Sequence, residues 1–208
     1  PRELTRISTT SPSAPTVHWP MIYTGVALTT LATLLLELTL TRIFSVVFYY
    51  HFAFLAISVA LFGLGAGGVF SYLVAAMPGG LYQKLGRLAT LTSLAILVSL
   101  VYLLSQSSEP TYLALIPIYF TSALPFLLAG IVVSLAIGEN IQNVERVYFF
   151  DLMGAAVGCM LLLPFLELFG GPNTVIAAAV LFAASSAVWF NLDRNFVGRA
   201  AGVALGLA

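Results

Sequence analysis

The feature that most constrains the fold is a series of apolar stretches, each long enough to cross a bilayer as a helix. Crossing the hydrocarbon core takes about 20 apolar residues. Only 8% of the residues are charged, whereas a soluble domain carries about 25%. The sequence therefore predicts an all-α, polytopic integral membrane helix bundle with six complete transmembrane helices and the start of a seventh. Their expected bounds are 21–44, 52–77, 88–105, 112–137, 148–169, 173–191 and 197 onward.

The regions between these stretches predict the orientation. Residues 1–20 are rich in Ser, Thr and Pro and are predicted to form a flexible or surface-lying arm, followed by a transmembrane helical domain over 21–208. Lys and Arg in short loops favour the cytoplasmic side. A cytoplasmic N-terminus leaves Arg42 alone outside and places seven basic residues inside: Arg2, Arg6, Lys84, Arg87, Arg146, Arg194 and Arg199.

Several classes of function find no support in the sequence. The formal net charge is zero, which argues against nucleic acid as a partner. The single cysteine, Cys159, cannot form a disulfide or a thiolate metal cluster within the chain. His18 and His51 are the only histidines, and the predicted topology places them on opposite sides of the membrane. We therefore predict no catalytic residue, no cofactor and no metal site.

The glycines of LFGLGAGGVFS (61–71) match the G-x-G-x-x-G pattern of a dinucleotide-binding loop. Such a loop requires a preceding strand and an acidic residue about 20 positions later, and both are missing here. On a helix, small residues spaced at four, three and four fall on one face, which allows two transmembrane helices to approach closely. We expect this face to pack against another helix, with a flexible hinge as the alternative: Ala56, Ala60, Gly63 and Gly67.

The first apolar stretch carries a polar stripe at helical spacing. Thr33, Glu37 and Thr41 follow Thr30 at intervals of three, four and four residues. A carboxylate inside a membrane is costly and usually faces the bundle with a partner. Arg42 lies about 140° around the helix from Glu37, so we expect it to meet another helix or to extend towards the interface.

The fifth stretch carries a second polar face. Tyr148 and Asp151 lie above Gly154 and Gly158, which form a G-x-x-x-G. Asp151 is expected near the cytoplasmic end, whereas Glu37 is expected in the outer half, so each needs its own partner. The cations expected near Asp151 are Arg146, Lys84 and Arg87. Both carboxylates can serve as hydrogen-bond anchors between helices or as parts of a proton or substrate relay.

Three segments resemble the membrane domain of bacterial membrane-bound spermidine synthase-like proteins: LELTLTRIFSVVFYYHFAFLAISVALFGLGAGG (36–68), PFLLAGIVVSLAI (125–137) and YFFDLMGAAVGC (148–159). In that family, a soluble domain similar to polyamine aminopropyltransferases follows the transmembrane helices. The resemblance implies an S-adenosyl nucleotide site in the soluble domain, which does not follow residue 191 here. No catalytic residue can be transferred.

Three functions remain open from the sequence. The first is an anchor or assembly module in the bacterial cytoplasmic membrane, without catalysis of its own. The second is a transporter of polyamines or other small cations that uses Glu37 and Asp151. The third is the membrane part of an aminopropyltransferase-like enzyme. Because the chain starts at Pro1 and ends within an apolar stretch, we expect a longer polypeptide. The expected partners are the lipid bilayer, other membrane subunits or a soluble domain of the same polypeptide.

Overall fold

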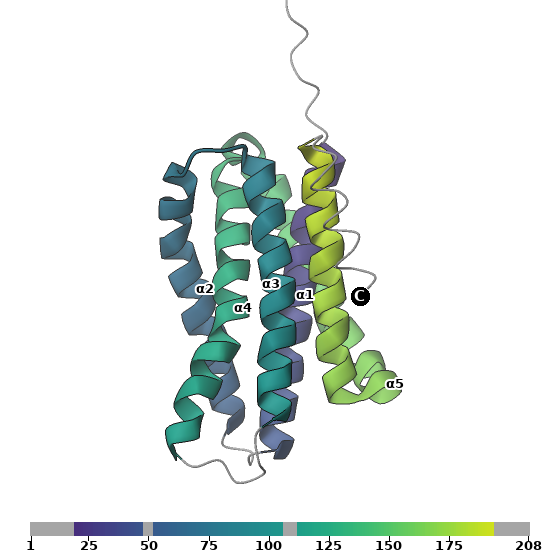
Figure 1. Ribbon diagram of the computed structural model, residues 1–208. Coiled ribbons are helices and arrows are strands. Elements are labelled where there is room, and N and C mark those ends of the chain that lie inside the picture. The colour runs from purple at the N-terminus through teal and green to yellow at the C-terminus, as the bar shows by residue number, and fades with distance from the viewer. Residues whose placement is uncertain (1–18, 48–51, 106–111, 194–208) are drawn as a thin grey trace, which may run out of the picture.

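The computed structural model describes residues 19–47, 52–105 and 112–193, and these residues form a bundle of long helices (Figure 1). No strand occurs in these three ranges. The elements in chain order are α1 (Trp19–Val47), α2 (Phe52–Ala76), α3 (Leu81–Leu104), α4 (Tyr112–Gly138), the short 3-10 helix η1 (Ile141–Asn143) and α5 (Val144–Leu192).

Five of the described helices are long and apolar enough to cross a membrane. The predicted count of six complete helices and the start of a seventh is therefore not supported. The predicted stretches 148–169 and 173–191 both fall within α5, a 49-residue element that consists of two helices joined by a kink. The predicted start of a seventh helix lies outside the described residues, as do residues 1–18 of the arm predicted over 1–20. The last two residues of that arm, Trp19 and Pro20, belong to α1.

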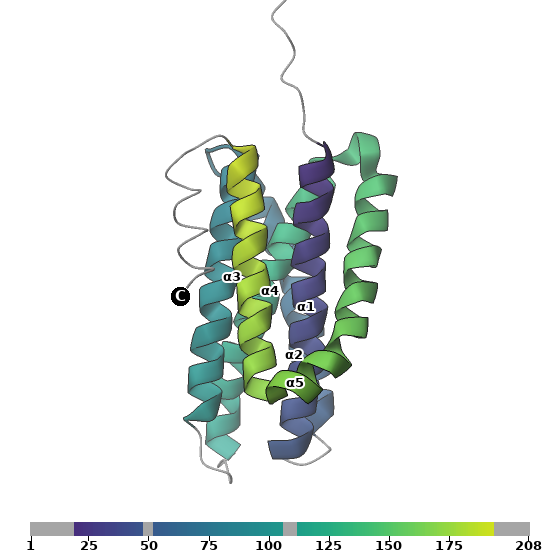
Figure 2. The same cartoon turned by 90° about the vertical axis from the view of Figure 1, so that its right-hand side faces the viewer.

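The long helix α5 is interrupted at Gly170, where φ is 76° and ψ is 172°. Residues with a side chain rarely adopt this positive φ. The carbonyls beside the break accept side-chain hydrogen bonds. Thr174 Oγ1 donates to Gly170 O at 2.7 Å, and Asn173 Nδ2 donates to Phe169 O at 2.9 Å. Figure 2 shows α5 running down beside α1, turning and returning. We call residues 144–169 the first arm, residues 171–192 the second arm and the turn between them the elbow.

The two ends of the bundle differ in how many basic side chains they carry, whereas acidic side chains, among them Glu139, Glu145 and Glu167, occur at both. The helices α1, α3 and α5 begin at one end, which carries Lys84, Arg87 and Arg146 and which we call the basic end (Figures 1 and 2). The opposite end, where α1 and α3 finish and α5 turns, is the elbow end. Arg42 lies in the last part of α1, towards the elbow end.

The helix α3 begins at Leu81 rather than at the predicted Leu88. The predicted start was too late because it followed hydropathy and therefore left out the charged residues Lys84 and Arg87. Those residues belong to the first turns of the helix. Lys84 Nζ donates hydrogen bonds to Val74 O at 3.0 Å and to Ala75 O at 3.1 Å, and also to Met77 O. These carbonyls lie at the end of α2, where helices lack intrahelical donors. Lys84, near the start of α3, therefore caps the C-terminal end of α2.

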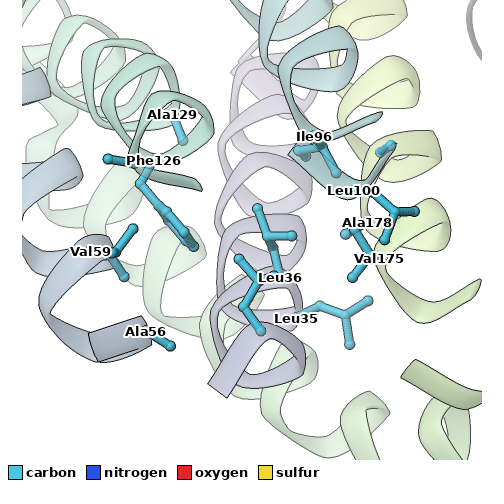
Figure 3. Close-up of a cluster of buried hydrophobic side chains, with 14 of the residues drawn as sticks. Leu35, Leu36, Ala56, Val59, Ile96, Leu100, Phe126, Ala129, Val175 and Ala178 are labelled. Atoms are coloured by element: carbon cyan, nitrogen blue, oxygen red, sulfur yellow. The ribbon is translucent and has the colours of Figure 1, made fainter. Parts of the chain in front are cut away.

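The apolar core includes side chains from every long helix (Figure 3). Leu35 and Leu36 of α1 lie at the centre of the cluster. The other helices contribute Val59, Ile96, Leu100, Phe126, Ala129, Val175 and Ala178. Because lipid removes most of the hydrophobic incentive for helix association, close contact of these side chains is a main source of cohesion.

The second arm lies between α1 and α3 and is hydrogen-bonded to both (Figure 2). The hydroxyls of Thr29 and Ser185 are 2.8 Å apart, and those of Thr90 and Ser186 are 2.6 Å apart. Ser93 Oγ also donates to Ala179 O at 2.8 Å. The second arm therefore presents consecutive serines to two different helices.

Two glycines, one turn before these threonines, make room for two large rings. A Cβ atom on Gly25 would lie 2.8 Å from the ring of Trp189, and a Cβ atom on Gly86 would lie 2.9 Å from the ring of Phe190. The segments GVALT (25–29) and GRLAT (86–90) thus form the same arrangement on α1 and α3. We call these two G-x-x-x-T segments the Gly–Thr sites.

Candidate functional site

The small-residue face of α2 packs against α4. A Cβ atom on Gly63 would lie 2.6 Å from Phe126 Cβ, and a Cβ atom on Gly67 would lie 2.3 Å from Leu127 O. Ala56 and Ala60 on the same face are buried. Since α2 is helical throughout Gly63–Gly68, these residues do not form a nucleotide-binding loop.

The G-x-x-x-G of the first arm packs against the backbone of α1. A Cβ atom on Gly154 would lie 2.2 Å from Ala27 O, and a Cβ atom on Gly158 would lie 2.7 Å from Leu31 O. Both contacts advance by four residues, so α1 and the first arm run parallel. The small-residue faces predicted on the second and fifth apolar stretches thus contact two different helices, α4 for the glycines of α2 and α1 for those of the first arm.

This parallel contact also places Asp151 beside α1. Thr30 Oγ1 lies 2.6 Å from Asp151 Oδ1 and 2.9 Å from Val26 O. Thr30 is buried and Asp151 is half-buried. The expected cationic partners do not form ion pairs with Asp151 within the described residues. The first arm contacts α1 through its small residues, and the polar group of α1 that lies beside Asp151 is the Thr30 hydroxyl.

The Thr30 hydroxyl has one hydrogen and two acceptors within reach. A hydroxyl donates one hydrogen bond and accepts through its lone pairs. If Thr30 donates to Val26 O, its contact with Asp151 requires a proton on the carboxyl group. If Asp151 is ionised, Thr30 donates to the carboxylate and leaves Val26 O. The site therefore has two hydrogen-bond arrangements that differ by one proton.

Glu37 lies apart from this pair. It is seven residues beyond Thr30 on α1, which corresponds to about 10 Å along the helix. Its side chain is half-buried, and within ranges 19–47, 52–105 and 112–193 its carboxylate has no hydrogen-bond or ion-pair partner. Glu37 and Asp151 are thus two separate polar positions, and the structure does not bring them into one site.

The other predicted polar residues have local roles. Thr33 Oγ1 donates to Thr29 O at 2.7 Å, and Thr41 Oγ1 donates to Glu37 O at 2.8 Å. Tyr148 is 54% exposed on the outer side of the first arm. Arg42 is exposed and lines two cavities near the elbow end. No group of three or more His, Cys, Asp or Glu side chains suited to a metal ion occurs among the residues that the structure describes.

Comparisons with known proteins do not add a family to this geometry. No protein-family model, curated protein or solved structure matches the chain. The candidate site therefore rests on the side chains themselves.

Two arrangements in the structure were not predicted from the sequence. The Gly–Thr sites carry a signal, because GVALT and GRLAT share their spacing and the second arm carries paired serines and paired aromatic residues. The second arrangement places Arg42 and Glu167 around one cavity. It has no local sequence signal, because it depends on the parallel contact between α1 and the first arm.

We predict an energetic coupling between Thr30 and Asp151. In a double-mutant cycle with Thr30→Val and Asp151→Ala, the coupling free energy should be about 1 kcal/mol, within the range measured for hydrogen bonds between membrane helices. The measurement is the free energy of unfolding in mixed micelles. Thr33→Val is the matched control, since Thr33 donates only to its own helix, and it should show no coupling to Asp151. Equal coupling for both threonines would contradict the assignment.

Proposed function

We propose that this chain is a membrane-embedded anchor or assembly module without catalysis of its own. The observation that supports this role most directly is the use of the interior hydroxyl groups. Thr29, Ser185, Thr90 and Ser186 hydrogen-bond across the second arm, and Ser93 binds a backbone carbonyl of the same arm. These groups join helices to one another, which suits a bundle that holds its shape.

The proposal includes an arrangement in the bilayer. As one straight helix, α5 would extend about 74 Å, more than twice the hydrocarbon thickness of about 30 Å. We place each arm of α5 across the membrane, which gives six crossings by the described chain. The basic end faces the cytoplasm by the positive-inside rule, and the membrane is the cytoplasmic membrane of a bacterium.

The partner in this proposal is a soluble domain of the same polypeptide or another membrane subunit. The resemblance of 36–68, 125–137 and 148–159 to spermidine synthase-like proteins supports this choice. An enzyme of this type would carry its nucleotide-binding glycine loop in the soluble domain. The full reading frame of the gene tests that version, because it either encodes such a domain after Ala208 or does not.

A transporter of polyamines or other small cations is the second candidate. It is favoured by the Thr30–Asp151 contact, which differs by one proton between its two arrangements. In such a transporter, Asp151 would exchange a proton or a substrate cation near the basic end. Glu37 would be a second position along the same face of α1.

Flux measurements in proteoliposomes separate the two candidates. For an anchor, radiolabelled spermidine should enter vesicles that contain the protein no faster than protein-free vesicles. For a transporter, the protein should raise uptake at least about tenfold, and Asp151→Asn and Glu37→Gln should abolish the increase. Glu139→Gln, an exposed carboxylate beyond α4, is the control. Copurification of partner chains in mild detergent supports the assembly role, and a clean monomer would contradict it.

A further inference from the structure

A cavity of about 820 Å³ lies between α1, the start of α2 and the first arm at the elbow end. Its size is within the range of about 300–1,000 Å³ that is typical of ligand pockets. It is lined by two oppositely charged side chains, Arg42 and Glu167, together with Thr41, Ser45 and several leucines. Within the described residues, Arg42 and Glu167 form no ion pair with each other or with another side chain.

The hydroxyl groups of this cavity can act only as acceptors towards a ligand while they keep their present bonds. Thr41 Oγ1 donates its hydrogen to Glu37 O, and Ser45 Oγ donates its hydrogen to Arg42 O, each at 2.8 Å. The lone pairs of both oxygens stay available. Glu167 adds a carboxylate, which as an anion only accepts hydrogen bonds. The cavity therefore combines three acceptor groups with one guanidinium donor.

A primary ammonium group has three N–H donors and a positive charge, so it matches the acceptor groups. A phosphate matches Arg42, because the guanidinium fork binds phosphate oxygens in pairs. A ligand that carries both groups would neutralise both charged side chains. The ethanolamine headgroup of a phospholipid has this chemistry, whereas a choline headgroup has no N–H donor.

The surroundings favour a lipid over a soluble ligand. Leu38, Leu162, Leu163 and Leu166 form the apolar part of the cavity wall. Arg42 and Leu166 also line a neighbouring cavity of about 340 Å³, whose other residues are almost all apolar and come from α1, α3 and the elbow. Arg42 is 23 residues beyond Trp19, or about 35 Å along α1. In the bilayer arrangement proposed above, this distance exceeds the hydrocarbon thickness, so Arg42 lies at the headgroup level on the elbow side.

We propose that this cavity binds an ethanolamine phospholipid. Arg42 holds the phosphate, while Glu167 and the hydroxyl oxygens of Thr41 and Ser45 accept hydrogen bonds from the ammonium group. An acyl chain lies along Leu38, Leu162 and Leu163, which are nearer the middle of the bundle than Arg42. The site rests on the bilayer arrangement proposed above, but not on Asp151 or on the anchor role.

The test uses the purified chain in vesicles that contain ethanolamine, choline and glycerol phospholipids in equal amounts and with identical acyl chains. Lipids that remain bound after mild detergent extraction are counted by native mass spectrometry. We expect the ethanolamine lipid to be retained about tenfold over the choline lipid, since hydrogen bonds to charged groups account for at least that difference. Equal retention of the two lipids would overturn the proposal, and this comparison needs no variant.

Variants assign the residues. Glu167→Gln should remove the preference for ethanolamine over choline, and Arg42→Gln should lower the retention of all three phospholipids. Glu145→Gln and Arg146→Gln, exposed at the basic end, are the matched controls and should change nothing. An unchanged preference in Glu167→Gln would overturn the assignment. Displacement of the lipid by millimolar free phosphoethanolamine would do so as well, because it would show that a soluble compound fills the cavity.

Discussion

Leucine in place of Gly67 should separate α2 from α4. A Cβ atom at this position would lie 2.3 Å from Leu127 O and 2.9 Å from Gly130 Cα and Ile131 N. These are backbone atoms of a helix, so they cannot move aside without shifting α4. Overpacking a well-packed interior costs about 1–3 kcal/mol, and contact with a rigid backbone should reach or exceed the upper value. The measurement is the midpoint of thermal unfolding in detergent.

Gly65→Leu is the matched control, because a Cβ atom on Gly65 would meet no atom within 4 Å. It makes the same chemical change on the same helix, two residues away. We expect it to leave the unfolding midpoint close to that of the parent chain. Gly63→Leu should resemble Gly67→Leu, since Phe126 and Ala123 surround that position. If Gly67→Leu and Gly65→Leu unfold at the same temperature, the proposed α2–α4 contact is wrong.

The second large effect is expected from Trp189→Ala. Trp189 has no exposed surface and fills the space beside Gly25. Removing a buried aromatic side chain typically costs about 3–5 kcal/mol, because the surrounding helices close the cavity only in part. Denaturant titration in mixed micelles measures this loss. Ile176→Ala is the control on the same arm, since Ile176 is 42% exposed and should lose much less.

The Trp189 prediction has a second test that depends on its position beside α1. Gly25→Leu alone should destabilise the bundle, because its Cβ atom would lie 2.8 Å from the Trp189 ring. In the Trp189→Ala background, the same leucine has room and fills part of the cavity. Gly25→Leu should therefore be less harmful with Trp189→Ala than alone. Simple additivity of the two changes would show that Gly25 and Trp189 do not share a contact.

Much of the helical architecture could be predicted from hydropathy, because apolar runs of this length have few alternatives in a membrane. The starts of helices were harder to predict where a helix begins with charged residues before its apolar run, as α3 does with Lys84 and Arg87. The predicted stretches 148–169 and 173–191 left residues 170–172 as their connection, and the chain leaves helical geometry there only at Gly170. One residue with positive φ is enough to turn α5, so the two stretches form two helical arms joined by a kink.

The choice of partner helix could not be predicted in the same way. Small residues at Gly63 and Gly67 indicated a contact face, but in lipid most apolar helix surfaces are chemically alike. Contact with α4 depends on complementary shape, including Gly130, whose added Cβ atom would lie 2.7 Å from Leu64 O. Similarly, Asp151 was a clear candidate, but its neighbour Thr30 follows from the parallel alignment of α1 with the first arm. Long-range register of this kind is not encoded in any local pattern.

The matching Gly–Thr sites on α1 and α3 have a consequence for the order in which the bundle assembles. The second arm contacts both sites with adjacent residues, so the two contacts can exist together only when α1 and α3 stand the right distance apart. During synthesis, both helices precede the second arm by many residues. The last described helix segment therefore completes the structure, and a chain shortened before Thr174 would leave α1 and α3 without the element that joins them.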